Sequence, residues 1–339
     1  MRVAMYYRNN DVRLEEMPTS EIGPEEVLVK AMASGICGSD VMEWYRVKRA
    51  PLVLGHEMAG EIAEVGAGVQ NWSPGDRVFA SHHIPCNTCH QCLTGHHTAC
   101  KTLHTTNYDP GGFAEYVRLP ALNVDRGLFR LPDQMDFDTA TFIEPVACVV
   151  RGLRGVGALP GSSYLILGSG ISGLLHIAAA RHFGAGTIFA TDLNATRREF
   201  AREFGATEVF DPNVSLPAEL SEANDGRLAD CVIVSTGATE AAAQALTCVE
   251  PGGTVLYFAV PTEEISVPIN DFWRNDITIR TTYGNSPADA EQAIAFLQAG
   301  YVPVDRMITH RLPLSETQRG FQLVAAGQDS LKVVIHPQE

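Results

Sequence analysis

The stretch Tyr164-Leu-Ile-Leu-Gly-Ser-Gly-Ile-Ser-Gly173 decides the fold of this chain. Four apolar residues typical of a buried strand lead directly into three glycines with the spacing Gly-x-Gly-x-x-Gly, and a helical pattern follows. Glycine at 168 allows a tight turn, and glycine at 170 lets the backbone approach a pyrophosphate. Glycine at 173 lets the helix pack on the strand. Because the amides at the helix start favour an anion, the stretch predicts a dinucleotide site.

An acidic residue stands where such a site needs one. Asp192 ends the next predicted strand, Thr187–Thr191, 19 residues beyond Gly173. Its carboxylate can accept hydrogen bonds from ribose hydroxyls and would repel a 2′-phosphate, so it favours NAD over NADP. Alternatively, Asp192 caps the helix that starts near Ala195. The cofactor-binding residues predicted around this turn are Gly168, Gly170, Ile171, Ser172, Gly173, Asp192 and Arg197.

The chain has two regions with different predicted secondary structure. From Ser163 onward, apolar strands such as Cys231–Val234 alternate with helices, which implies a parallel sheet covered on both faces. The first ~145 residues instead contain short apolar runs broken by Gly and Pro, typical of a mainly β domain. A strand at Lys332–Ile335 ends the pattern. We predict an α/β protein whose nucleotide-binding domain, residues 151–285, is inserted into a catalytic domain of residues 1–150 and 286–339.

Composition narrows the classes of function. The chain has 339 residues, of which 45% are hydrophobic and 19% charged, as in soluble globular proteins. It has no apolar run of about 18 residues that would span a membrane. Its N-terminus lacks the apolar core of a signal peptide, so we expect a cytoplasmic location. The formal charge of −15 would repel phosphate backbones and argues against nucleic acid as a partner.

Half of the eight cysteines fall in one short segment, with the pattern Cys-x2-Cys-x2-Cys-x7-Cys at Cys86, Cys89, Cys92 and Cys100. In a cytosolic chain, clustered cysteines indicate metal before disulfide. Four thiolates that close a tetrahedron leave no place for substrate, which is typical of a structural zinc site. We interpret the neighbouring His90, His96 and His97 as surface residues.

A second set of metal-binding residue types is dispersed along the chain. It lies in Gly35-Ile-Cys-Gly-Ser-Asp40, Gly55-His-Glu-Met-Ala-Gly60 and Ile143-Glu-Pro145. A catalytic zinc takes three protein ligands and keeps one position open. Cys37 and His56 are the natural first pair. Either Glu57 or Glu144 can supply an oxygen ligand, and the sequence leaves that choice open.

Together with Gly111-Gly-Phe-Ala-Glu-Tyr116, these motifs make the chain resemble the zinc-dependent medium-chain dehydrogenases along essentially its whole length. Glu144-Pro145 looks most like the polyol (sorbitol-type) and threonine dehydrogenase branches. The resemblance implies a GroES-like catalytic domain, an inserted Rossmann domain, two zinc ions per subunit and NAD. It implies hydride transfer from a secondary alcohol or polyol to NAD, with zinc stabilising the alkoxide. The implied catalytic residues are Cys37, Ser39, His56, Glu57 and Glu144.

The resemblance carries further expectations. Thr236-Gly237 and the loop at Ala259-Val260 would line the nicotinamide. The protein would form a homodimer or homotetramer, with Pro251–Phe258 as an edge strand at the interface. Ser39, two residues after Cys37, would take the proton of the alcohol.

Two places depart from the family pattern. Met42 and Glu43 stand where many relatives carry a histidine or another polar residue, so the proton path beyond Ser39 cannot be carried over. His82-His83 offer an alternative path. Thr282 stands where sorbitol-type enzymes have an arginine, so their polyol contacts cannot be carried over either.

Competing functions remain at this point. Arg46, Lys48 and Arg49 would suit a phosphorylated polyol, and a threonine-type activity is a related alternative. A different class is a non-catalytic nucleotide-binding or structural zinc protein, which the full set of candidate zinc ligands opposes. Candidate pocket aromatics, which could equally be packing residues, are Trp44, Tyr45 and Tyr108.

Overall fold

The computed structural model describes residues 1–328 and 330–339, which fall into two compact units. One unit combines Met1–Ala147 with Gly284–Glu339, and the other consists of Cys148–Tyr283. The chain therefore leaves the first unit, builds the second, and returns. Mixed α/β architecture was predicted, and it is confirmed.

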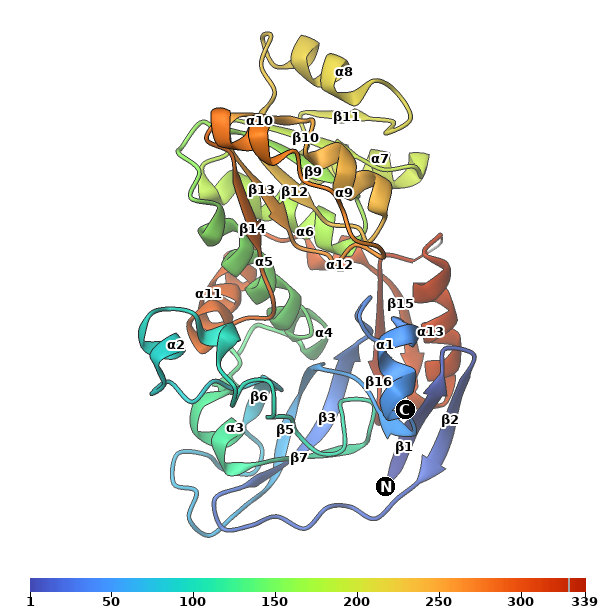
Figure 1. The fold of residues 1–339 in the computed structure, drawn as a ribbon. Coiled ribbons are helices and arrows are strands. Elements are labelled where there is room, and N and C mark those ends of the chain that lie inside the picture. The colour runs from blue at the N-terminus through green and yellow to red at the C-terminus, as the bar shows by residue number, and fades with distance from the viewer. Residues whose placement is uncertain (329) are drawn as a thin grey trace. The chain divides into compact units, whose positions relative to one another are not determined.

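The second unit is built on a six-stranded sheet in the order β11-β10-β9-β12-β13-β14 (Figure 1). All its strand pairs are parallel. Chain order and spatial order diverge at β9, because β10 and β11 lie to one side of it and β12 to β14 to the other. Ligands of such sheets bind at this reversal, beyond the carboxyl ends of the strands. The strands are β9 (Ser163–Leu167), β10 (Thr187–Thr191), β11 (Glu208–Phe210), β12 (Ala229–Val234), β13 (Val249–Tyr257) and β14 (Thr278–Thr281).

Helices connect these strands. β9 is buried at every position, so it needs cover on both faces. α6 packs against β9 and β10, and α9 packs against β12 and β13. The helices of this part of the chain are α5 (Ile143–Val156), which begins in the first unit, α6 (Ile171–Ala180), η3 (Arg181–Phe183), α7 (Ala195–Glu203), α8 (Leu216–Ala223), α9 (Thr239–Ala245) and α10 (Ile269–Arg274).

One sequence expectation about this sheet is wrong. Pro251–Phe258 was expected to be an edge strand, but β13 pairs with β12 on one side and β14 on the other. β14 forms the edge instead, and all four of its residues are exposed. The reason is that the short, exposed strand β14 pairs with β13 and so extends the sheet by one strand.

The first unit contains two sheets. One runs β15-β16-β3-β5-β6-β8, with β7 also paired to β3, and the other runs β2-β1-β4. Tyr6, Phe113 and Phe321 pack together in its core, with ring centroids 5.6 and 5.8 Å apart. The strands are β1 (Arg2–Arg8), β2 (Asp11–Glu16), β3 (Val27–Gly35), β4 (Leu52–Val53), β5 (Glu57–Val65), β6 (Arg77–Ala80), β7 (Tyr116–Leu119), β8 (Leu128–Arg130), β15 (Ile308–Pro313) and β16 (Lys332–His336).

Short helices fill most connections of the first unit, and the longer helix α13 packs against the C-terminal strands β15 and β16. Ser286 and Asp289 form a capping box at the start of α11, which fixes where that helix begins. The helices are α1 (Glu43–Arg46), η1 (Val47–Arg49), α2 (His90–Leu93), η2 (His97–Ala99), α3 (Ala121–Arg126), α4 (Phe137–Ala140), α11 (Pro287–Gln298), α12 (Val304–Met307), η4 (Leu314–Glu316) and α13 (Thr317–Ala326).

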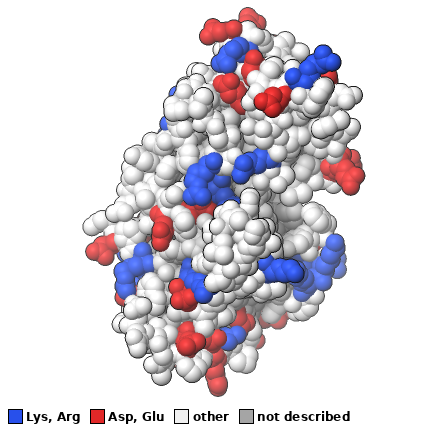
Figure 2. Space-filling model, turned by 60° about the vertical axis from the view of Figure 1, so that its left-hand side comes forward, with Lys and Arg blue, Asp and Glu red and all other residues white. Residues whose placement is uncertain are grey.

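Within the described ranges, no helix has both the length and the apolar character needed to cross a membrane. On the face drawn in Figure 2, acidic and basic side chains are interspersed among uncharged residues. The negative net charge is thus not gathered into a single acidic field on that face.

Candidate metal and nucleotide sites

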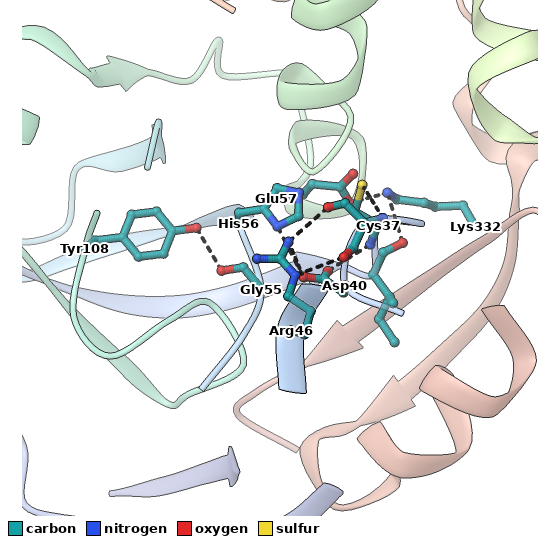
Figure 3. A network of polar contacts seen from close by, with 10 residues as sticks. Cys37, Asp40, Arg46, Gly55, His56, Glu57, Tyr108 and Lys332 are labelled. Atoms are coloured by element: carbon teal, nitrogen blue, oxygen red, sulfur yellow. Dashed lines mark hydrogen bonds and ion pairs between the residues drawn. The ribbon is translucent and has the colours of Figure 1, made fainter. Parts of the chain in front are cut away.

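Strand pairing explains why distant residues meet in the first unit. Gly35, the last residue of β3, lies opposite Glu57, the first residue of β5. β16 pairs with the same end of β3, with Val334 opposite Gly35. The segments that follow β3 and precede β5 therefore bring Cys37 and His56 to one place, and β16 brings Lys332 beside them (Figure 3).

Cys37, His56 and Glu57 form a group whose sulfur, nitrogen and oxygen atoms all lie within 4.8 Å of one another. Thiolate, imidazole and carboxylate are the donors that zinc prefers in proteins, and three of them leave one tetrahedral position open. Cys37 and His56 are half-buried and Glu57 is buried. The donor set therefore fits a catalytic zinc ion.

Glu144 lies outside this group of donors, as far as the described residues show. It is buried near the start of α5, where the side-chain amide of Asn285 donates a hydrogen bond to it at 3.3 Å. The structure thus brings Glu57 to Cys37 and His56, and Asn285 donates a hydrogen bond to Glu144.

Asp40 and Arg46 reinforce the group, and sequence reasoning assigned neither of them this role. Asp40 is fully buried, accepts a hydrogen bond from the Cys37 amide at 3.0 Å, and lies 3.3 Å from Nδ1 of His56. Burial acts to raise the pKa of Asp40, but His56 and Arg46 outweigh it and lower that pKa. Asp40 is part of the Cys-Gly-Ser-Asp motif, so its place in the motif was the available signal.

The electrostatics of the group favour a cation. Burial acts to lower the pKa of His56, but the negative charges of Asp40 and Cys37 outweigh it and raise that pKa well above its usual range. A positive charge at His56 is therefore stabilised by its neighbours. A divalent metal ion supplies such a charge while leaving the imidazole neutral.

Ser39 lies within the same network. Its hydroxyl accepts a hydrogen bond from Nη2 of Arg46 at 3.1 Å, and its carbonyl accepts one from Nε at 2.9 Å. A guanidinium donates only and does not lose its proton in proteins. A proton taken up by Ser39 therefore leaves by a route other than Arg46.

The histidines and aromatic residues predicted near this group differ in burial and in contacts. The ring of His82 lies 5.0 Å from that of His56 and 3.9 Å from that of His83. Burial lowers the pKa of His83 to about 4, so this ring is neutral at physiological pH. Tyr108 is 3% exposed and donates to the carbonyl of Gly55 at 3.3 Å, which makes it a packing residue. Trp44 and Tyr45 are exposed on α1.

The four cysteines of the lobe meet as their spacing predicts. Their sulfur atoms lie within 4.8 Å of one another, and all four cysteines are free of disulfide bonds. The amide of Cys86 points at the sulfur of Cys100, 3.4 Å away, and the amide of Cys89 points at the sulfur of Cys86, 3.3 Å away. His90, His96 and His97 do not join this group. The lobe fits a closed tetrahedral zinc site.

The glycine-rich turn in the second unit has the geometry its sequence predicts. Gly168 has a φ of +91°, which favours glycine, and a Cβ on Gly173 would lie 1.9 Å from the carbonyl oxygen of Gly168. Gly170 precedes α6, which begins at Ile171 and Ser172. The backbone can therefore approach a ligand closely at the start of this helix.

Asp192 is held beside the turn. Its carboxylate accepts hydrogen bonds from the amides of Ser169, at 2.9 Å, and Asn194, at 2.8 Å. The alternative that Asp192 caps the next helix is wrong, because the side chain of Asn194 caps α7. Nη1 of Arg197 lies 4.0 Å from the carboxylate and close to Gly170. Arg197 thus reaches the turn as well.

The remaining predicted cofactor residues lie near one another. The side chain of Thr236 lies alongside Gly168, because a Cβ on Gly168 would lie 3.0 Å from it. Likewise, a Cβ on Gly237 would lie 3.3 Å from the carbonyl oxygen of Val260. Val260 is 66% exposed, so its side chain is accessible to a ligand.

Comparison with known proteins adds the family. Two family models match the chain, the alcohol dehydrogenase GroES-like domain over residues 23–133 and the zinc-binding dehydrogenase over residues 172–299. Sorbitol dehydrogenase of Bacillus subtilis is 31% identical over 350 residues, covering 99% of this chain and 97% of that protein. The chain belongs to the zinc-dependent medium-chain dehydrogenases. As a member of that family it is an oxidoreductase of the GroES-like and Rossmann fold that uses zinc and a nicotinamide cofactor.

Further medium-chain dehydrogenases resemble the chain equally broadly. L-threonine 3-dehydrogenase of Bacillus velezensis is 34% identical over 334 residues, covering 96% of this chain and 95% of that protein. The crystal structure of galactitol-1-phosphate dehydrogenase from Escherichia coli superposes with a TM-score of 0.89 at 26% identity, covering 99% and 100% of the two chains. The relatives thus share a fold and differ in the substrates that their names give.

Proposed function

We propose that this dehydrogenase oxidises a secondary alcohol or polyol with NAD, in the first unit at Cys37, His56 and Glu57. The observation that carries the proposal is the three-donor group, braced by the buried carboxylate of Asp40. A non-catalytic zinc protein does not need three donors that leave a position open. The similarity to a sorbitol dehydrogenase supports a polyol as the substrate.

Each residue of the group has a distinct task in this proposal. Cys37, His56 and Glu57 would hold a zinc ion, which supplies Lewis-acid stabilisation of negative charge on the substrate oxygen when it is bound. Asp40 orients His56 through Nδ1, which presents the other ring nitrogen for ligation. Glu144, near the start of α5, would act on the reaction through water or substrate.

Ser39 is the first proton acceptor in this proposal. Arg46 fixes the Ser39 hydroxyl by donating to it at 3.1 Å, so a lone pair and the serine proton remain available. When Ser39 accepts the substrate proton, its own proton passes to water. The guanidinium charge stabilises the electron-rich oxygen during this exchange.

NAD is the proposed cofactor because of Asp192. Its carboxylate is 11% exposed at the glycine-rich turn, where it would meet a ribose hydroxyl and repel a 2′-phosphate. Arg197 lies 4.0 Å from Asp192, so its charge is at least partly neutralised there. We place the cofactor on Gly168, Gly170, Ile171, Ser172 and Gly173, with Thr236, Gly237 and Val260 at the nicotinamide.

The broader assignments follow the same proposal. Residues 1–150 and 286–339 would form the catalytic domain and residues 151–285 the NAD-binding domain, in a cytoplasmic homodimer or homotetramer. The exposed edge strand β14 can pair with a second copy, since an unpaired strand edge is a template for another strand. Trp273 on α10 is 81% exposed and adds apolar surface.

The test is a screen for NAD reduction with polyols, phosphorylated polyols, hydroxy-amino acids and simple secondary alcohols, with zinc measured on the same sample. We expect two zinc ions per subunit, NAD reduction with at least one secondary alcohol or polyol, and much slower NADP reduction. A protein that carries both zinc ions and oxidises none of these compounds would contradict the proposal.

A phosphorylated polyol is the second candidate, and Arg46 is the observation that favours it. Its side chain is 18% exposed and reaches Ser39 and Asp40 as well as the ring of Tyr45, whereas Lys48 and Arg49 lie over the rings of Trp44 and Tyr45. Of the three cations expected to suit a phosphate, Arg46 is thus the one that reaches the residues around Cys37. The likeness to a galactitol-1-phosphate dehydrogenase supports testing this class in the same screen.

A further inference from the structure

One of the three donors, Glu57, also takes part in a buried ion pair. Nζ of Lys332, on β16, contacts Oε2 of Glu57, on β5 (Figure 3). Both side chains are 1% exposed. The two residues are 275 positions apart in the chain, and they meet because β16 and β5 pair with the same end of β3.

The backbone beneath the pair is shaped to admit it. A Cβ on Gly35 would lie 2.2 Å from Oε2 of Glu57 and 2.7 Å from Cε of Lys332, which is closer than real contacts allow. Lys332 lies 3.5 Å from the carbonyl oxygen of Ile36 and 5.6 Å from the centre of the Phe142 ring. The anionic partner of Lys332 is thus Glu57.

Stability alone does not explain such a pair. Removing two charges from water costs several kcal/mol per ion, and apolar residues of similar volume often serve equally well. Glu57 is also the oxygen donor that lies within 4.8 Å of the Cys37 sulfur and a ring nitrogen of His56. One carboxylate therefore faces two cationic positions, the ammonium of Lys332 and the place that a metal ion would take.

We propose that Lys332 is a positioning residue that holds one carboxylate oxygen of Glu57 away from the metal position. Glu57 then ligates through its other oxygen only, and the remaining coordination position stays open for substrate. The inference rests on the proposed function, because it assumes that Cys37, His56 and Glu57 bind zinc. It adds a residue from β16 that controls how strongly the carboxylate engages the metal.

Two substitutions of Lys332 should then change the ligation of zinc by Glu57 in opposite directions. In Lys332→Met, Oε2 of Glu57 loses its buried partner, so the carboxylate turns both oxygens to the metal. In Lys332→Arg, the planar guanidinium can hold both carboxylate oxygens and withdraw them from the metal. A role confined to stability would not separate these two variants in this way.

The experiment measures zinc affinity by competition with a chromophoric chelator, and follows the zinc ion that His56→Ala loses. We expect the dissociation constant to fall about tenfold in Lys332→Met and to rise about tenfold in Lys332→Arg, each corresponding to ~1.4 kcal/mol. In the cobalt-substituted protein, the visible absorption of Lys332→Met should weaken as the coordination number rises. The turnover of Lys332→Met should fall about tenfold or more, because the open position is lost.

Two controls separate the inference from other effects. Lys30→Met makes the same change on β3, away from the donor group, and should leave zinc affinity unchanged. In a Glu57→Gln background, Lys332→Met should no longer tighten zinc binding, because the effect passes through the carboxylate. Where Lys332→Met does not fold, Lys332→Arg and its Glu57→Gln double variant give the same test with the opposite sign.

The outcomes are distinct. Unchanged affinity in both Lys332 variants, a change in the same direction in both, or an undiminished effect in the Glu57→Gln background would overturn the inference. If His56→Ala keeps as much zinc as the unaltered protein, the proposed function fails instead. A protein with a His56-dependent zinc ion and dehydrogenase activity, but indifferent to position 332, retains its function and loses only this inference.

Discussion

The two candidate metal sites of this chain are built in opposite ways. The four cysteines of the lobe come from one segment of fifteen residues, and their donors are all sulfur. The group at Cys37 draws sulfur, nitrogen and oxygen from the ends of two strands, and the bracing residues Asp40 and Lys332 come from further segments. The donors of the lobe meet within one loop, whereas the donors at Cys37 meet only because the strands of the first unit pair.

The difference teaches what each site can do. Four thiolates saturate a zinc ion, so the lobe contributes by tying its loop together, with Leu103 packed among the cysteines. Three mixed donors leave an open position, and each of the charged neighbours can tune it. We therefore expect damage to the lobe to cost stability, and damage to the group at Cys37 to cost chemistry.

The largest effect should come from His56→Ala. Zinc should fall from two ions per subunit to one, and kcat/KM should fall by about 10⁴-fold, because the ligand and its link to Asp40 are lost together. The measurements are metal content and steady-state kinetics. A variant that retains a tenth of the activity would show that the group at Cys37 does not carry the reaction.

Cys92→Ser should produce the converse result. Cys92 is 5% exposed within the lobe, and its loss should release the lobe zinc and lower the free energy of unfolding by on the order of 4 kcal/mol, part of the ~10–16 kcal/mol of a whole structural site. Urea unfolding and metal content check this. For protein that remains folded, kcat/KM should change less than about threefold; a loss as large as that of His56→Ala would erase the contrast between the sites.

A residue outside both metal sites should also make the free energy of unfolding depend on pH. His176 on α6 is fully buried, and burial lowers its pKa to about 4. Between that value and about 6.5 the unfolded chain binds the proton and the folded chain does not, so unfolding free energy rises with pH by on the order of 3 kcal/mol. His176→Leu should flatten this rise in urea unfolding between pH 4 and 6.5. An unchanged slope would assign the pH dependence to other groups.

The smallest expected effect is that of Asp40→Asn. The amide keeps an oxygen near Nδ1 of His56 but removes the buried charge, so zinc affinity at the group should fall about tenfold to a hundredfold while the lobe keeps its ion. Chelator competition measures both sites in one sample. Equal weakening of both zinc ions would mean that Asp40 acts through general stability rather than through His56.

The same contrast explains how much the sequence could predict. The lobe and the Gly168–Gly173 turn are local, so residue spacing alone specifies which atoms meet. The sequence left open whether Asp192 caps the helix after it, and in the structure Asn194 caps α7. Both residues have the chemistry of a cap, and only the backbone shows which one starts the helix.

Contacts between distant strands were beyond the sequence. Lys332 was predicted as part of a strand, but its pairing with Glu57 depends on how β16, β3 and β5 are aligned. The choice between Glu57 and Glu144 had the same character, because both are suitable ligands by type. The edge strand was misplaced because residue pattern does not show which strand Thr278–Thr281 pairs with, and in the structure it extends the sheet beside β13.

The 275 residues between Glu57 and Lys332 also order events in time. At the rate of synthesis of about 5 to 20 residues per second, Glu57 is synthesised roughly 14 to 55 s before Lys332, its counter-ion. The whole of Cys148–Tyr283 is made within that interval and can fold on its own sheet. During translation, therefore, Cys148–Tyr283 is complete while Glu57 still lacks its counter-ion, and β16, the last strand made, both completes the sheet and neutralises that charge.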